Sequence, residues 1–148
     1  MRKRSENLSK FIAIAAAEEQ KTGRLVGQSR RQLNEHVDRL GELNAFRHEY
    51  LGKGLSSGSY DSAHYKDYQG FLSRLDAAVR SQKQIIADSE QAVEIHRKRW
   101  MEKRQRLESL ERVREQYRAE EHQQEQRQEQ RVLDDLPPGP SAFNEDET

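Results

Sequence analysis

The sequence predicts an all-α protein in which two long helices form an antiparallel coiled-coil hairpin. Two stretches carry a seam of residues that recurs in alternating steps of three and four, and a Gly/Ser-rich segment separates them. Hydrophobic residues make up only 32% of the chain, whereas charged residues make up 35%. A layered globular core needs more apolar material, but a seam between two helices needs only about two positions in seven.

The first helix is expected from about residue 5 to residue 51. Ser5 is a candidate N-terminal cap, and Glu6 lies favourably in the first turn. Three glycines interrupt the helix, and each costs up to about 1 kcal/mol relative to alanine. The expected seam contains Leu8, Ile12, Ala15, Glu19, Thr22, Val26, Ser29, Leu33, His36, Leu40, Leu43, Arg47 and Tyr50.

Residues 1–17 also have the outline of a secretory signal, because basic residues precede a short apolar run. That run is mostly alanine, follows Glu6, Asn7 and Ser9, and falls within the heptad frame. We therefore interpret it as part of the first helix.

The loop is expected at residues 52–60, which form the densest glycine and serine cluster of the chain. The second helix is then expected from about residue 61 to residue 131, with Ser59 or Asp61 as its cap. Its seam should contain Leu72, Leu75, Val79, Gln82, Ile86, Ser89, Val93, His96, Trp100, Lys103, Leu107, Leu110, Arg114 and Tyr117.

Folding about this loop makes residue i face roughly residue 117 − i. Everything after about Arg112 then lacks an intramolecular partner. The hairpin domain is expected to cover residues 1–133. Residues 134–148, which contain Pro137-Pro138-Gly139-Pro140 and several acidic residues, are expected to be a disordered tail.

The sequence offers no pattern typical of an enzyme. There are no cysteines, the five histidines never pair at a spacing of three or four residues, and no glycine-rich phosphate loop is present. We therefore predict no catalytic site, metal, cofactor or small-molecule substrate. No stretch approaches the roughly 20 apolar residues that span a membrane, and the expected location is the cytoplasm.

A basic cluster surrounds Trp100 on the second helix. Phosphate contacts with base stacking on the indole would indicate a nucleic-acid interface. We favour the alternative that Trp100 lies in the seam and the basic side chains form a solvated face. A third interpretation is electrostatic contact with an acidic protein surface. The cluster runs from His96 to Arg106, and the residues expected to make such a contact are Arg97, Arg99, Lys103, Arg104 and Arg106.

A second stripe flanks the seam near the loop. Phe71, Leu75, Ala78 and Gln82 follow one another at i, i+4, i+7 and i+11, and Phe71 lies outside the frame. Phe46 is also out of frame, and the pairing rule places it opposite Phe71. These aromatic residues exceed what a two-helix seam can bury, which favours an exposed docking patch over a wider local core.

Three segments resemble the FliJ family of flagellar type III export proteins. They are Phe46–Leu51 (FRHEYL), Tyr68–Ala78 (YQGFLSRLDAA) and Trp100–Leu107 (WMEKRQRL), and the Glu/Gln/Arg-rich end of the second helix agrees as well. The order of the helices and the position of the loop match over nearly the whole chain.

The resemblance implies a coiled coil similar to the central stalk of rotary ATPases, which inserts its helix ends into the export ATPase hexamer and promotes its assembly and activity. It also implies contact with the export-gate membrane protein, engagement of export chaperones, a role in motility and chemotaxis, and peripheral association with the inner membrane at the flagellar base. The implied gate patch is Phe46, Tyr50, Phe71, Leu75 and Ala78, and it ends at Gln82, where this sequence departs from the histidine that the family pattern implies. A generic coiled-coil chaperone or scaffold, or a nucleic-acid-binding hairpin, remains the alternative.

Overall fold

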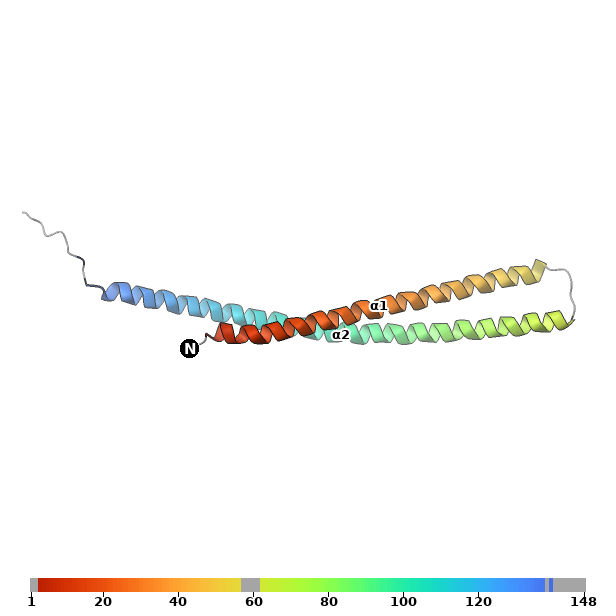
Figure 1. Cartoon of the computed structure of the whole chain (residues 1–148), viewed down its shortest axis with the longest axis horizontal. Coiled ribbons are helices and arrows are strands. Elements are labelled where there is room, and N and C mark those ends of the chain that lie inside the picture. The colour runs from red at the N-terminus through yellow and green to blue at the C-terminus, as the bar shows by residue number, and fades with distance from the viewer. Residues whose placement is uncertain (1–2, 57–61, 138, 140–148) are drawn as a thin grey trace, which may run out of the picture. The chain divides into compact units, whose positions relative to one another are not determined.

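Two long α-helices make up almost all of the described chain. A computed structural model describes residues 3–56, 62–137 and 139, and these residues contain no strand. Helix α1 spans Arg4–Ser56 and helix α2 spans Ser62–Asp135, so each continues several residues past its expected end (Figure 1). The central part of the expected loop, residues 57–61, lies outside the described residues.

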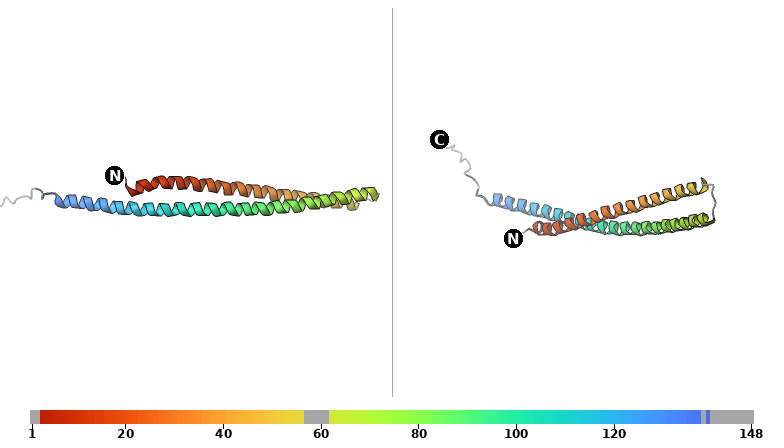
Figure 2. Two further views of the ribbon diagram at one scale, coloured as in Figure 1. Left: turned by 90° about the horizontal axis from the view of Figure 1, so that it is seen from below. Right: turned by 45° about the vertical axis from the view of Figure 1, so that its right-hand side comes forward.

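The helices pack against each other in two compact units. The first unit comprises residues 16–105, and the second comprises residues 1–15 with residues 106–148. Within each unit a segment of α1 lies beside a segment of α2 that runs in the opposite direction (Figure 2). The predicted fold class, an all-α antiparallel helical hairpin, is therefore confirmed.

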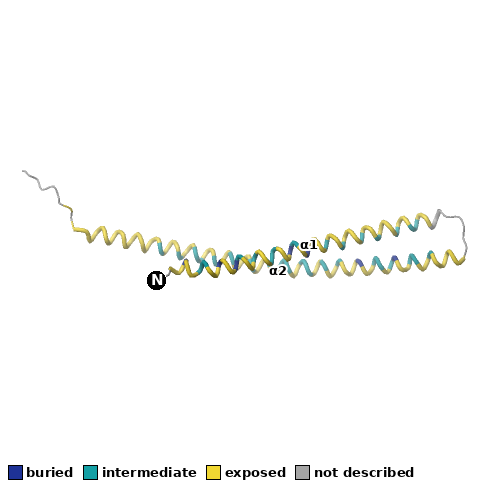
Figure 3. Tube along the Cα trace, in the orientation of Figure 1, coloured by how far each residue is buried: buried dark blue, intermediate teal, exposed yellow. Residues whose placement is uncertain are grey.

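Both predicted seams are confirmed as the contact faces. Every position in the two heptad frames is buried or half-buried, while the outer faces are exposed (Figure 3). The least exposed apolar side chains are Ile12, Ala15, Val26 and Leu75, and none in the described residues falls below 2% exposure. A two-helix interface always leaves a solvent edge, so this core is thin and depends on contacts at its margins.

The apolar run near the N-terminus belongs to α1. Ile12 and Ala15 face the partner helix, whereas Phe11 and Ile14 are about 60% exposed. Met1 and Arg2 lie outside the described residues. The helical interpretation of the segment therefore holds for its described part.

The predicted cap at Ser5 is wrong. The first backbone bonds of α1 end on the Lys3 carbonyl, which accepts from the amides of Glu6 at 3.1 Å and Asn7 at 3.2 Å. Ser5 lies inside the first turn, where it is only 6% exposed. Its hydroxyl donates to Glu121 of α2 instead of capping its own helix.

The prediction that α2 loses its partner after about Arg112 is also wrong. Residues at the start of α1 contact Tyr117, Glu121 and Glu125. Side chains lean toward the N-terminus of their own helix, so long side chains of an antiparallel pair meet partners further along each chain than a straight count gives. The count holds in the first unit for the contact of Phe46 with Phe71 and, within one residue, for those of Tyr50 with Tyr68 and His36 with Gln82.

Helix α2 ends where the sequence turns to Asp134, Asp135 and proline. The Leu136 amide still donates to the Leu133 carbonyl at 3.4 Å, and no helix follows in the described residues. Pro138 and residues 140–148, on which the prediction of a disordered tail depends, lie outside the described residues.

Candidate partner-binding surfaces

An aromatic cluster joins the two helices near the loop in the first unit. The Tyr50 ring stacks on Tyr68 at 5.1 Å between ring centres and meets Phe71 at 4.5 Å. Phe46 meets the edge of Phe71 at 6.1 Å, so the predicted pairing of these two rings is confirmed. We call Phe46, Tyr50, Tyr68 and Phe71 the aromatic cluster.

Tyr68 was not among the sequence candidates. It lies one step of four before Leu72 and so continues the seam frame toward the loop, a signal that was available in the sequence. Tyr65, one turn earlier, is 54% exposed, and its hydroxyl accepts a hydrogen bond from Gln69 at 3.1 Å.

The residues of the expected gate patch occupy different environments. Leu75 is 8% exposed and Gln82 is 5% exposed, so both lie in the helix interface. The Gln82 amide donates to the His36 carbonyl at 2.9 Å, which satisfies a polar side chain at a seam position. Ala78 is half-buried, whereas Phe46 is 49% exposed. The accessible apolar surface therefore lies toward the loop.

An ion pair borders the aromatic cluster. Arg47 Nε donates to Asp76 Oδ1 at 2.6 Å, and both side chains are about 40% exposed. An exposed pair of this kind contributes roughly 0–1 kcal/mol, so it orients the two helices more than it stabilises them.

Trp100 lies in the seam, as the favoured interpretation predicted. Its indole Nε1 donates to Glu19 Oε1 at 2.9 Å, and the Arg104 guanidinium lies 5.5 Å from the ring centre. The ring packs over Gly23, where an added Cβ would lie only 3.2 Å from Nε1. Glycine at this position makes room for the indole, so the residue that softens α1 also seats the largest side chain of α2.

Most of the basic cluster in the first unit is engaged within the protein. Arg97 pairs with Glu94 one turn earlier at 2.8 Å, and their hydrogen bond raises the pKa of Arg97 and lowers that of Glu94 from its ordinary 4.5. Lys103 pairs with Glu18 across the helices at 2.8 Å. Arg99 is exposed.

Arg106, the last member of the basic cluster, begins the α2 segment of the second unit and is also exposed. The two arginines whose side chains are most available for an acidic partner are therefore Arg99 and Arg106.

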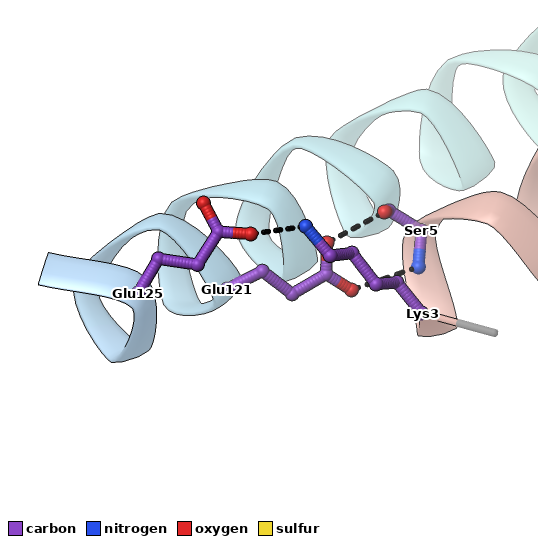
Figure 4. A network of polar contacts seen from close by, with 4 residues as sticks. All are labelled: Lys3, Ser5, Glu121 and Glu125. Atoms are coloured by element: carbon purple, nitrogen blue, oxygen red, sulfur yellow. Dashed lines mark hydrogen bonds and ion pairs between the residues drawn. The ribbon is translucent and has the colours of Figure 1, made fainter. Parts of the chain in front are cut away.

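Polar contacts join the start of α1 to α2 in the second unit (Figure 4). We call the residues that make them, Lys3, Arg4, Ser5, Tyr117, Glu121 and Glu125, the clasp. Glu121 of α2 accepts two hydrogen bonds from Ser5, one from the hydroxyl at 2.6 Å and one from the backbone amide at 3.1 Å. Lys3 forms an ion pair with Glu125. Arg4 lies over the Tyr117 ring at 5.8 Å from its centre.

Charge and hydrogen bonding shift two pKa values in the clasp. The Ser5 hydroxyl, the Ser5 amide, Lys3 and Arg118 together lower the pKa of Glu121 from its ordinary 4.5. The hydrogen bond to Glu125 raises the pKa of Lys3 from 10.5. Sequence reasoning missed the clasp, although Glu121 continues the seam frame one step of four after Tyr117.

Neither a metal centre nor a membrane span emerges from the described ranges. No group of three or more His, Asp or Glu residues there could hold a metal ion. Within the same ranges, neither helix is long and apolar enough to cross a membrane.

The fold and these surfaces define a class of protein, a coiled-coil hairpin that carries aromatic and charged surface clusters along its helices. Comparison with known proteins identifies the family. The profile of the flagellar FliJ protein family matches residues 4–137.

Two relatives agree with that match. The flagellar FliJ protein of Escherichia coli (strain K12) is 28% identical over 126 residues, covering 83% of this chain and 85% of the relative. The flagellar FliJ protein of Salmonella typhi is 26% identical over 130 residues, with the same shares of each chain covered. The chain therefore belongs to the flagellar FliJ protein family and is a component of flagellar protein export.

Proposed function

We propose that this protein is a stalk-like, non-enzymatic partner of the flagellar export ATPase that links the ATPase ring to the export gate. One observation supports the proposed contact with the ATPase. Helix α2 continues past Glu125, the last residue in contact with the start of α1, and every residue from 122 to 137 is exposed. We call residues 126–135 the α2 extension.

The composition of the α2 extension suits insertion into another protein. Its glutamine, glutamate and arginine residues favour a helix but offer no apolar face until Val132 and Leu133, each 62% exposed. An isolated helix of this length frays in water, so a surrounding partner would order it. An apolar tip on a charged helix is a surface that an enclosing ring can bury.

Stimulation of the cognate ATPase by shortened chains tests this proposal. A chain ending at Gln126 keeps all clasp residues and loses most of the extension. We expect its half-maximal stimulation of ATP hydrolysis to require about ten times more protein, equivalent to about 1.4 kcal/mol of binding. A chain ending at Leu136 is the matched control and should stimulate fully. Equal stimulation by both shortened chains would contradict the proposed contact.

The aromatic cluster is the proposed contact with the export-gate membrane protein. Phe46 is half exposed beside rings that hold it in place, and an exposed ring on a rigid support is typical of a binding hot spot. The expected patch residues Tyr50, Phe71, Leu75, Ala78 and Gln82 then support the surface from beneath or beside it.

Phe46→Ala should weaken binding to the gate protein by about tenfold while leaving the helices intact, because hot-spot truncations cost at least about 1 kcal/mol. Val37→Ala is the matched control, since Val37 is also on α1 and 48% exposed but lies outside the cluster. Binding by calorimetry and helicity by circular dichroism separate the two effects. Equal weakening by both variants would exclude a specific patch.

We further propose that the protein engages export chaperones, contacts acidic protein surfaces through Arg99 and Arg106, and associates peripherally with the inner membrane at the flagellar base. Cells lacking it should lose motility and therefore chemotaxis. Co-purification of the ATPase, the gate protein and the chaperones from membrane fractions tests these contacts, and charge reversal at Arg99 or Arg106 should make the weakened contact less sensitive to salt.

The two alternative functions have less support. Three members of the basic cluster already contact Glu94, Glu18 or the Trp100 ring, and the indole Nε1 is bound to Glu19, which leaves little of a stacking platform for bases. A generic scaffold would not require the family match over residues 4–137.

A further inference from the structure

The first turn of α1 has an unmet need for hydrogen-bond acceptors. The first amides of any α-helix have no partner within the helix. In α1 the Lys3 carbonyl accepts hydrogen bonds from the amides of Glu6 and Asn7. The Ser5 amide precedes these bonds and has no acceptor within the helix. Lys3 also precedes the helix without being one of the side chains that accept such bonds, unlike Ser, Thr, Asp or Asn.

Glu121 supplies the missing acceptor from the opposite helix. One carboxylate oxygen accepts from the Ser5 amide and the other from the Ser5 hydroxyl, so both oxygens are occupied at the start of α1. A negative charge at this position also suits the positive end of the helix dipole. The carboxylate thus does for α1, from another segment of the chain, what an N-cap side chain normally does.

The remaining clasp contacts lie on the same face of α2. Positions 117, 121 and 125 are four residues apart, so their side chains lie one above another. Lys3 and Glu125 remain about half exposed, in contrast to Ser5. The clasp is therefore made of charged and polar groups at the edge of solvent.

Few apolar contacts back up the clasp. Between Ser5 and the first buried apolar residue, Ile12, only Leu8 and Ser9 of α1 are half-buried, and the others are exposed. Opening the clasp would therefore release residues 3–9 at little hydrophobic cost, and the packing of Ile12 would stop the fraying.

We propose that Glu121 acts as an N-cap of α1 supplied by α2, and that this cap, reinforced by Glu125, is a charge-dependent clasp that opens without unfolding the rest of the hairpin. When closed, it holds residues 3–9 on α2. When open, it uncovers Leu8 on α1 and Tyr117 on α2. The clasp and its test do not depend on the proposed ATPase contact.

Amide hydrogen exchange of the full chain tests the clasp. In Glu121→Ala we expect the amides of residues 5–9 to exchange about tenfold faster, because losing a typical cap changes local opening by a factor of that order. Glu120→Ala is the matched control, since Glu120 is an exposed neighbour of the same charge. The amides of residues 26–33 in the first unit should not change in either variant.

The pH dependence provides a second readout. The groups that face Glu121 are Lys3, Ser5 and Glu6 from the α1 side and Arg118, His122 and Glu125 from α2. Because the pKa of Glu121 is lowered on folding, its contribution is complete above about pH 4.5 and is lost as the pH falls through the folded value. Protection of residues 5–9, corrected for intrinsic exchange, should fall over this range.

Glu121→Gln retains an acceptor but removes the charge, so its protection should be intermediate and its acid step smaller, since the Lys3–Glu125 ion pair remains. Two results would overturn the proposal. One is unchanged exchange of residues 5–9 in Glu121→Ala. The other is equal acceleration at residues 26–33, because that result would mean global destabilisation instead of a local clasp.

Discussion

The two units of this protein join the same two helices by different chemistry. In the first unit, rings fill the margins of the seam: the aromatic cluster near the loop, and Trp100 seated over Gly23. In the second unit, the interhelical contacts at the start of α1 are a carboxylate cap, an ion pair and a cation over a ring. Packed, half-buried rings resist local opening, whereas exposed polar contacts weaken with salt and pH.

This difference teaches where a thin coiled coil can open. Apolar burial stabilises in proportion to the area removed from water and is insensitive to ionic strength, so the ring contacts of the first unit should persist when its ion pairs Arg47–Asp76 and Lys103–Glu18 are screened. The second unit contains the α2 extension and the clasp, and the clasp contacts depend on charge. The proposed charge-dependent clasp and the ring contacts that resist opening therefore lie in different units.

The largest expected effect concerns the support itself. Leu75→Ala should lower the free energy of unfolding by about 2–3 kcal/mol, because a buried leucine loses its contacts and leaves a cavity. Phe46→Ala, which removes a half-exposed ring, should cost less than about 1.5 kcal/mol. Urea denaturation followed by circular dichroism compares them. If both cost the same, Leu75 would not be core.

The next largest expected effect concerns Gly23, over which Trp100 packs. Gly23→Leu should destabilise the hairpin by about 1–3 kcal/mol, because the added side chain would displace the indole and break its hydrogen bond to Glu19. The fluorescence of this single tryptophan should shift to longer wavelength as water reaches the ring. An unchanged emission spectrum would show that the ring does not depend on Gly23.

Substitution of two other glycines of α1 should stabilise the protein instead of destabilising it. Gly27 and Gly41 have nothing within 4 Å of an added Cβ. Gly27→Ala and Gly41→Ala should each stabilise the protein by about 0.5–1 kcal/mol, because alanine is the better helix former. Thermal unfolding of these variants and of Gly23→Leu tests whether the space beside each glycine decides if its substitution stabilises or destabilises the protein.

The smallest effect lies within α2 alone. Glu94 hydrogen-bonds Arg97 on the surface, so NMR titration should find its pKa below 4.5, and Arg97→Gln should return it to the ordinary value. The stabilising effect of the pair is present above the ordinary pKa and is lost as the pH falls through the lowered one. If the pKa of Glu94 were the same in the wild type and in Arg97→Gln, the two side chains would not form this pair in solution.

Much of the site could be read from the sequence because it follows helical periodicity. The contact of Phe46 with Phe71 and the seam position of Trp100 required only spacing and a loop position. The burial of Leu75 and Gln82 could not be read from spacing alone. Each belongs to both the seam and the flanking stripe, so only the packing decides whether it is buried or exposed.

The seam frame could have placed Glu121 on the contact face, but its partner Ser5 could not be predicted, because the pairing depends on the reach of long side chains. A straight count across the seam ended the pairing near Arg112, whereas Ser5 contacts Glu121. Each side chain leans toward the N-terminus of its helix, and the resulting offset grows with side-chain length. The same geometry decides that Ser5 donates to the opposite helix instead of capping its own.

By itself, the sequence determined two long helices, their contact faces and their antiparallel order, because these follow from local periodicity and from one Gly/Ser-rich break. Only the tertiary structure decided which seam residues are truly buried, how Gly23 accommodates Trp100, and where α1 is fastened to α2. The physical reason is that periodicity fixes directions around a helix axis, whereas contacts between helices depend on side-chain lengths and on distances along it.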